Sequence, residues 1–315
     1  MFHIIVNPNA CSGRGRKNWE IVRRILDEQK VEYEVFFSKK HGEAADRARE
    51  LHASLPSLNL MILGGDGTIN EVIQGLPDLD NVSLSAIPVG SSNDLARGLG
   101  ISQDPEEAIR HLLTKPTILY MDMGIVHCEN SLVRDGSMTI PDRRFLVSSG
   151  FGYDAAVCEE ALSSGIKNFL NRLGLGKLSY LLICLKQLLA FKYATAELTL
   201  EGSGETKTFD KLVFMGAMNN RFEGGGFMFA PDASNHDGLI DLIVVSDVKK
   251  PNIIKLLPTA LHGEHIGKDG IQLFRTHGYS VRSSIPLWVH TDGEVETKAD
   301  YVSVTCVKEA VKLVF

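Results

Sequence analysis

The first third of the chain alternates apolar runs with amphipathic runs, and this alternation is the strongest constraint on its fold. Strand-like runs occur at 2–7, 31–38, 58–63 and 84–89, and helical patterns at 15–29, 41–53, 69–75, 92–98 and 104–114. Repeated β-α-β units predict a parallel sheet with helices on its faces. Ligands of such folds bind at the carboxyl ends of the strands.

The pattern changes after about residue 118. Short period-2 segments, separated by Gly, Asn, Asp and Pro, predict a mainly antiparallel β domain, a sandwich. A helical segment at 166–191 interrupts it, and residues 127–142 have the composition of an exposed hairpin loop. A chain of 315 residues is long for a single core. We therefore predict an α/β domain over 1–120 and a β-rich domain over 121–306.

Composition excludes several classes of protein. The net charge of -6 argues against a nucleic-acid binder. The five cysteines have no Cys-x-x-Cys spacing, which predicts reduced thiols without disulfides or a zinc site. We likewise expect no ligand cluster among the ten histidines. The N-terminus lacks signal-peptide features and no apolar run reaches the roughly 18 residues of a membrane span, so we expect a cytoplasmic protein.

One strand–turn–helix junction, at 60–76, combines three glycines with an acid. The glycines are Gly64, Gly65 and Gly67. They allow backbone N–H groups to converge on a phosphate, and the helix that follows adds its dipole. Asp66 would repel a phosphate unless it acts through Mg²⁺. The alternative is a helix capped by a Thr68–Glu71 capping box.

A second junction, at 87–100, repeats this arrangement. Gly90 and Ser91 are candidate phosphate contacts, and Asn93 and Asp94 bring a second carboxylate to the same sheet edge. The alternative is again a capped helix, here with Ser91 and Asp94 as the capping box.

A third acid, Asp122, follows a strand at the domain junction. Phosphoryl transfer depends on positioning and on charge neutralisation, mostly by Mg²⁺. Magnesium prefers oxygen ligands, keeps several waters and usually takes only one or two carboxylates. Asp66, Asp94 and Asp122 are therefore candidate ligands, directly or through water.

Several segments together resemble the diacylglycerol kinase catalytic-domain family, most closely its soluble bacterial lipid kinases. They are 7–15, 64–72, 88–100, 224–245 and 291–294. NAD kinases and phosphofructokinases share the first glycine motif, but the whole set is specific. The resemblance covers nearly the whole chain. It implies a fold like that of NAD kinase and diacylglycerol kinase, in which residues 307–315 return to the first domain.

The resemblance also implies ATP as phosphoryl donor, Mg²⁺ as cofactor and a lipid hydroxyl as acceptor. The implied nucleotide-binding residues are Asn7, Pro8, Ser12, Gly13, Ser38, Gly64, Gly65, Asp66, Gly67, Thr68, Asn70, Gly90, Ser91 and Asn93. Ser38 and Ser91 stand where the family usually has threonine, and serine keeps the hydroxyl. As in the family, no Walker-type lysine follows the glycine turn.

Four acids form the implied catalytic set. Asp66, Asp94 and Asp122 match the acids that the family links to Mg²⁺ and its waters. Glu294, in the segment "HTDGEVE", matches the family's general base, which accepts the proton of the attacking alcohol. The alternative for this segment is an Asp-Gly hairpin turn followed by a solvated glutamate.

A second, structural Mg²⁺ site is implied at an Asp-Gly turn near residue 237. Its matching positions are Ser234, Asp237 and Leu239, the first and last through their carbonyl oxygens. An isolated Asp-Gly pair is more often a simple turn.

The acceptor side is less constrained by the sequence. A lipid substrate has to be taken from a bilayer, so we expect transient contact with a membrane surface near Leu173–Leu175, while the rest of that leucine-rich helix covers the β domain. A homodimer is compatible with the sequence. NAD kinase and an inactive nucleotide- or lipid-binding sensor are the alternative functions, and the identity of the lipid is left open.

Overall fold

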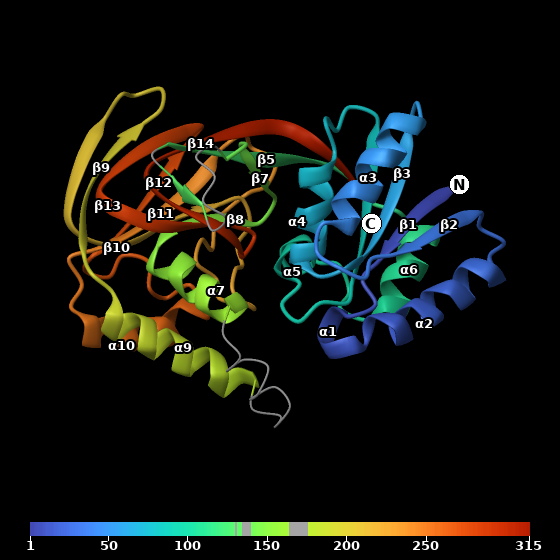
Figure 1. Cartoon of the computed structure of the whole chain (residues 1–315), viewed down its shortest axis with the longest axis horizontal. Coiled ribbons are helices and arrows are strands. Elements are labelled where there is room, and N and C mark those ends of the chain that lie inside the picture. The colour runs from blue at the N-terminus through green and yellow to red at the C-terminus, as the bar shows by residue number, and fades with distance from the viewer. Residues whose placement is uncertain (130, 134–139, 164–175) are drawn as a thin grey trace.

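The computed structural model describes residues 1–129, 131–133, 140–163 and 176–315. These residues form two lobes joined by one continuous sheet (Figure 1). The predicted membrane contact at Leu173–Leu175 lies outside the described residues, as does part of the predicted hairpin loop at 127–142. The mixed α/β architecture expected from the sequence is confirmed.

The first lobe alternates strands with helices. Its strands are β1 (Phe2–Val6), β2 (Tyr33–Phe37), β3 (Leu58–Gly64) and β4 (Val82–Pro88). Its helices are α1 (Ala10–Gly13), α2 (Gly15–Glu28), α3 (Glu43–Ser54), α4 (Asp66–Gly75), α5 (Asp94–Leu99) and α6 (Pro105–Thr114). The strands pair in parallel in the order β2-β1-β3-β4.

Side chains of β1 alternate between two hydrophobic cores. Ile4 packs in a cluster with Trp19 of α2, and Ile5 packs in a second cluster with Ala48 of α3. The strand is therefore apolar on both faces, which is why its sequence is a continuous hydrophobic run. Because the strands are parallel, their carboxyl ends meet along one edge of the sheet.

The second lobe is dominated by antiparallel strands. They are β5 (Ile118–Glu129), β6 (Leu132–Val133), β7 (Arg143–Phe145), β8 (Ser148–Gly152), β9 (Ala194–Leu200), β10 (Thr206–Met218), β11 (Ile240–Ser246), β12 (Ile271–Thr276), β13 (Gly278–Thr291) and β14 (Glu294–Val314). Its helices α7 (Tyr153–Ser163), α9 (Gly176–Ala190) and α10 (Lys250–Ala260) lie along one side of these strands (Figure 1). Among the described residues, every helix is too short or too polar to cross a bilayer.

The long strand β14 connects the two lobes. It begins beside β13, continues along β5 and ends in parallel pairing with β4, where Lys312 pairs with Ser83 and Leu313 with Leu84. The turn between β13 and β14 carries the Asp-Gly-Glu segment, and its Glu294 reaches Gly67 at the carboxyl edge of the first lobe.

Candidate active site

The two glycine turns of the first lobe contact each other. A Cβ on Gly90 would lie 2.5 Å from the Cα of Gly65, and a Cβ on Gly65 would lie 3.0 Å from the Cα of Gly90. Side chains at these positions would separate the turns, so glycine is required for their close approach. The ends of β3 and β4 thus present both predicted phosphate turns at one place.

The capping-box interpretation of the first turn is wrong. Helix α4 begins at Asp66 without a side-chain cap. Thr68 Oγ1 instead accepts a hydrogen bond from Asn7 Nδ2 at 3.1 Å, and Glu71 Oε1 accepts one from the Ala44 N–H at 3.0 Å. Thr68 and Glu71 therefore tie α4 to other elements.

The second capping box is also wrong. Asn93, in the left-handed conformation with φ 51°, is the N-cap residue of α5, and no side-chain cap is formed. Its Oδ1 accepts a hydrogen bond from the Gly90 N–H at 2.8 Å. Asn93 therefore stabilises the second glycine turn through this hydrogen bond, without lining the cleft itself.

A cleft of about 470 Å³ lies over the two turns. The predicted residues that line it are Asn7, Ser38, Gly65, Gly67, Thr68, Gly90, Ser91 and Glu294. Other predicted residues lie outside this lining within the described chain: Pro8, Gly13, Gly64, Asp66, Asn70 and Asn93. The side chain of Ser12 is outside the described part of the chain.

Six of the described residues line the cleft without belonging to the predicted set, and three of the six come from one segment. Lys39, Lys40 and His41 are exposed and follow Ser38 at the carboxyl end of β2. The two ammonium groups suit a polyanionic ligand and stand in a lobe whose glycine turns lack a Walker-type lysine. The sheet-edge rule that placed Ser38 at the site could have identified them too.

Asp66 ties the first glycine turn to the second. Its Oδ2 accepts a hydrogen bond from the Asp94 N–H at 2.8 Å, and its Oδ1 accepts one from the Leu95 N–H at 3.1 Å. Burial raises the pKa of Asp66, and these two N–H groups act in the opposite direction. The side chain of Asp66 is thus engaged at the start of α5.

Asp94 provides the carboxylate oxygen that best fits a cation. The residue is 3% exposed, and its Oδ2 accepts a hydrogen bond from the Gly225 N–H at 2.8 Å. Among the described residues, Oδ1 has no hydrogen-bond partner, although Arg97 Nε lies 3.8 Å away. Burial raises the pKa of Asp94 to about 6, and the charges of Asp66 and Glu223 add to this effect. A divalent cation would satisfy the bare oxygen.

Asp122 is fully buried behind the site. Its Oδ2 accepts a hydrogen bond from the Gly238 N–H at 2.6 Å, and its Oδ1 accepts one from the Glu309 N–H at 2.8 Å. Both oxygens therefore hold backbone of the second lobe. Two consecutive asparagines link Asp122 to Asp94: Asn219 Nδ2 donates to the Asp122 carbonyl oxygen and Asn220 Nδ2 to the Asp94 carbonyl oxygen, each at 2.8 Å.

The turn at Asp237 does not fit the second cation site. Asp237 Oδ2 forms an ion pair with Arg275, and its Oδ1 accepts a hydrogen bond from the Leu239 N–H at 3.0 Å. Arg275 Nε also lies 3.3 Å from Asp241 Oδ1. A guanidinium group thus occupies the carboxylate that a magnesium ion at Ser234, Asp237 and Leu239 would need.

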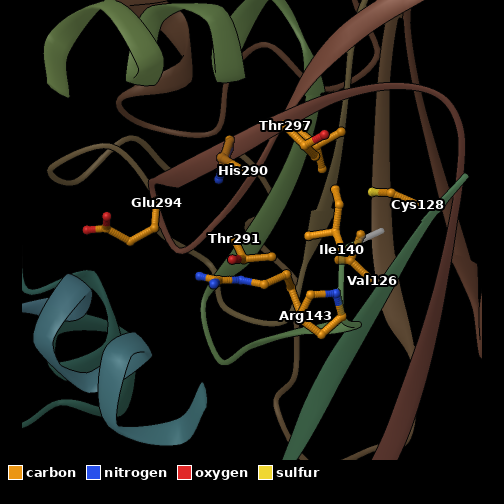
Figure 2. Close-up of a pocket in the computed structure, with 10 residues that line it drawn as sticks. Val126, Cys128, Ile140, Arg143, His290, Thr291, Glu294 and Thr297 are labelled. Atoms are coloured by element: carbon orange, nitrogen blue, oxygen red, sulfur yellow. The ribbon is translucent and has the colours of Figure 1, made fainter. Parts of the chain in front are cut away.

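Glu294 lies between two hollows of the molecule. It lines the cleft over the glycine turns and also a cavity of about 20 Å³ in the second lobe. In Figure 2 its side chain points away from Val126 and Ile140, which line that cavity. A Cβ on Gly67 would lie 2.5 Å from Glu294 Oε1, so the carboxylate reaches the first turn of α4.

Asp292 anchors the turn that carries Glu294. Its carboxylate accepts hydrogen bonds from the N–H groups of 146–148 at 2.8–3.1 Å, and from Asn70 Nδ2 at 2.9 Å. Burial raises the pKa of Asp292 to about 6 in spite of these bonds. The Asp-Gly hairpin turn exists, but Glu294 is half-buried against the first lobe. Asn70 supports this turn from outside the cleft.

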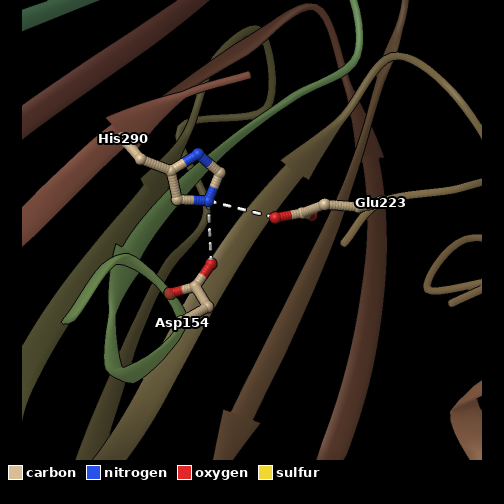
Figure 3. A group of neighbouring side chains, drawn as sticks. All are labelled: Asp154, Glu223 and His290. Carbon is tan, nitrogen blue, oxygen red and sulfur yellow. Dashed lines mark hydrogen bonds and ion pairs between the residues drawn. The ribbon is translucent and has the colours of Figure 1, made fainter. Parts of the chain in front are cut away.

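A cluster of three ionisable side chains lies next to the same turn. His290 Nε2 is 3.0 Å from Glu223 Oε1 and 3.3 Å from Asp154 Oδ2 (Figure 3). Their ligand atoms lie close enough together to hold a metal ion, so His290 belongs to an ionisable cluster that the sequence did not predict. The three residues come from distant parts of the sequence, and no local spacing could have joined them.

The fold and the site together define a phosphotransferase. A cleft over two glycine turns of an α/β lobe is lined on its other side by a carboxylate from a β lobe. Residues 1–126 match the diacylglycerol kinase catalytic domain, and residues 147–315 match the YegS C-terminal NAD kinase beta sandwich-like domain. The chain therefore belongs to the diacylglycerol kinase family.

Individual relatives agree with this assignment. The diacylglycerol kinase of Bacillus subtilis is 31% identical over 293 residues, which cover 92% of this chain and 88% of the relative. The diacylglycerol kinase of Mycobacterium tuberculosis is 26% identical over 258 residues, which cover 80% and 76%. A crystal structure of a diacylglycerol kinase from Bacillus anthracis shares the fold with a TM-score of 0.68, at 20% identity over 99% of this chain and 95% of that chain.

Proposed function

We propose that this kinase transfers the γ-phosphoryl group of ATP to a hydroxyl of diacylglycerol or a related lipid, with Mg²⁺ as cofactor and Glu294 as general base. The observation that carries the proposal is the position of Glu294, which lines both the cleft over the glycine turns and the cavity of the second lobe. A base has to reach the acceptor hydroxyl while that hydroxyl faces the phosphate.

The nucleotide is proposed to bind with its phosphates over the two glycine turns. This assigns the first lobe the parallel-sheet arrangement of NAD kinase and diacylglycerol kinase, in which backbone N–H groups of the turns contact the phosphates. Lys39 and Lys40 line the same cleft and supply positive charge. Bound Mg²⁺ would neutralise phosphate charge. Asp94 Oδ1, which has no hydrogen-bond partner among the described residues, is the ligand that fits it best. Asp66, on the first glycine turn, contacts the backbone of Asp94.

The chemical step follows from the place of Glu294. Its carboxylate accepts the proton of the lipid hydroxyl while the hydroxyl oxygen bonds to the γ-phosphorus, and the bond between that phosphorus and the β–γ bridging oxygen breaks. ADP leaves with the electron pair of the broken bond. Asp292 and Asn70 hold the turn, so that the base keeps a fixed position in the lining of the cleft. Asp122 supports the site as buried structure.

The acceptor is proposed to approach Glu294 from the second lobe. The cavity beside it, about 20 Å³, has room for little more than one water molecule, so the lipid chains are proposed to stay outside it. The apolar side chains of Val126 and Ile140 in its wall (Figure 2) favour a lipid over a dinucleotide. Such a substrate requires transient contact with a membrane surface. A homodimer is compatible with this arrangement.

Labelled ATP separates the proposed function from its alternatives. The purified protein is incubated with γ-labelled ATP and Mg²⁺, in parallel with a lipid extract in mixed micelles and with NAD. We expect label in the organic phase, followed by identification of the product by mass spectrometry. Label in an aqueous dinucleotide would instead identify an NAD kinase. Binding of ATP without transfer to either acceptor would identify an inactive sensor.

A further inference from the structure

We infer that His290 is a positioning residue: it couples Glu223 and Asp154 to the turn that holds Glu294. This inference rests on the proposed role of Glu294 as the base. His290 lies in β13, 1% exposed, next to the turn formed by Asp292 and Gly293. Its two ring nitrogens contact opposite sides of the site.

One side of the ring holds the catalytic turn. His290 Nδ1 accepts a hydrogen bond from the Gly293 N–H at 3.2 Å. Gly293 has φ 85°, a left-handed conformation that needs this residue type, and it directly precedes Glu294. The bond therefore fixes the peptide from which the proposed base extends. This hydrogen bond adds to those of the Asp292 side chain, which hold the preceding residue of the same turn.

The other side of the ring holds two acids. His290 Nε2 lies 3.0 Å from Glu223 and 3.3 Å from Asp154 (Figure 3). A Cβ on Gly150 would collide with both the His290 ring and the Asp154 carboxylate, so the absence of a side chain there makes room for this contact. The ring orientation is thus fixed by acids from two different segments.

The proton arrangement favours a hydrogen-bonded cluster over a metal site. Burial would lower the pKa of His290, whereas Cys158 and then the neighbouring Asp154 and Glu223 raise it well above the ordinary value and favour a doubly protonated ring. The N–H of Gly293 points at Nδ1, however, and an N–H cannot accept it. This direct contact leaves the proton on Nε2, between the two carboxylates. A metal ion on Nε2 would need the lone pair that this proton occupies.

Glu223 also connects the turn to the first lobe. Two residues later in the chain, the Gly225 N–H donates to Asp94 Oδ2 at 2.8 Å. One short segment therefore contacts the acid that best fits a cation and, through His290, the turn of the base. This path gives the two halves of the proposed site a shared mechanical support.

Two substitutions separate the two sides of the ring. His290→Asn keeps an acceptor oxygen near the place of Nδ1 but loses the contact with the acids. His290→Gln keeps a donor near the place of Nε2 but loses the acceptor for Gly293. The measurements are kcat and KM for ATP with the lipid acceptor, Tm, and amide exchange of the peptide that contains Gly293.

The inference predicts opposite orders for activity and stability. We expect His290→Gln to lose ~10- to 100-fold in kcat, since a small misplacement of a catalytic group has effects of that size, with unchanged KM for ATP and faster exchange at Gly293. His290→Asn should keep a higher kcat than His290→Gln despite an equal or lower Tm, because the asparagine leaves two partly buried acids without their donor. A kcat that follows Tm in both variants would mean a purely structural role and overturn the inference.

Two further measurements keep this test independent of the proposed function. Turnover of the wild type with lipid tests the proposed function alone. Amide exchange at Gly293 reports on the order of the Asp292–Gly293 segment even if the protein does not phosphorylate the lipid. Gly150→Ala, which displaces the ring without changing its chemistry, should also speed exchange at Gly293 and lower kcat. A stoichiometric metal ion in the purified protein that is lost in Glu223→Gln would replace the inference with a metal site.

Discussion

Glu294 Oε1 lies 2.5 Å from the position that a Cβ on Gly67 would occupy, so the proposed base contacts the helix that begins at the phosphate turn. Gly67→Ala should therefore displace the carboxylate. We expect kcat to fall about 100-fold, while helix propensity favours alanine by up to about 1 kcal/mol. Turnover and Tm are measured together. Shortening the acid as well, in Gly67→Ala with Glu294→Asp, should relieve the collision, and full turnover of Gly67→Ala alone would contradict this placement.

Glu294→Gln should leave folding and ATP binding intact but lower kcat by ~10²- to 10⁴-fold, the usual contribution of a general base. The amide keeps the size of the side chain and loses the ability to take a proton. Steady-state kinetics and ATP titration check the result, and Glu32→Gln, an exposed position outside the site, serves as control. Near-normal turnover of the Glu294 variant would remove this residue from the role of base.

Asp94 should make stability depend on pH when magnesium is absent. Its pKa is raised by burial from 3.8 to about 6, so the folded state binds the proton more tightly than the unfolded chain. This contribution to the free energy of unfolding, about 3 kcal/mol at most, is present below about pH 4 and is lost as pH rises through about 6. Denaturant unfolding from pH 4 to 7 should show a larger loss of stability in the wild type than in Asp94→Asn, where the pH dependence contributed by Asp292 remains.

Magnesium should reverse the effect of pH at Asp94, because the cation binds the ionised carboxylate. At pH 7, saturating Mg²⁺ should raise the Tm of the wild type more than that of Asp94→Asn. The same shift in both proteins would place the cation elsewhere.

Asp122→Ala should destabilise the protein regardless of magnesium. Its carboxylate accepts two buried backbone hydrogen bonds, and their loss should lower the free energy of unfolding by about 3–5 kcal/mol. Urea unfolding with and without Mg²⁺ measures this change. Asp210→Ala, at an exposed position, should change it by less than about 0.5 kcal/mol. A destabilisation that appeared only with Mg²⁺ would make Asp122 a cation ligand.

Sequence patterns were most informative where local structure and sheet topology act together. Ser38, Gly65 and Gly90 each follow a strand of the parallel part of the sheet, so their meeting at one edge follows from strand direction. Motif membership alone says less. Thr68 and Asn70 belong to the same motif, but residues two apart on a helix point about 200° apart, and only Thr68 reaches the cleft.

Contacts between distant segments account for what the sequence could not predict. The acids of Asp66 and Asp122 were expected near a cation, yet both hold backbone N–H groups from segments far along the chain. His290 meets Glu223 and Asp154 only through the packing of the second lobe. Neither composition nor spacing encodes these encounters.

Strand β14 has a consequence for how the enzyme can move. β14 starts at Glu294, and its far end pairs with β4 beside Ser83. The two lobes are therefore connected by a hydrogen-bonded strand and not by a flexible linker, which restricts their relative motion. A rotation of one lobe relative to the other therefore requires a change in the twist of β14. The natural place is the irregularity at Glu309, where φ is 52° and the register with β5 shifts. We therefore expect domain closure to carry the base along with it.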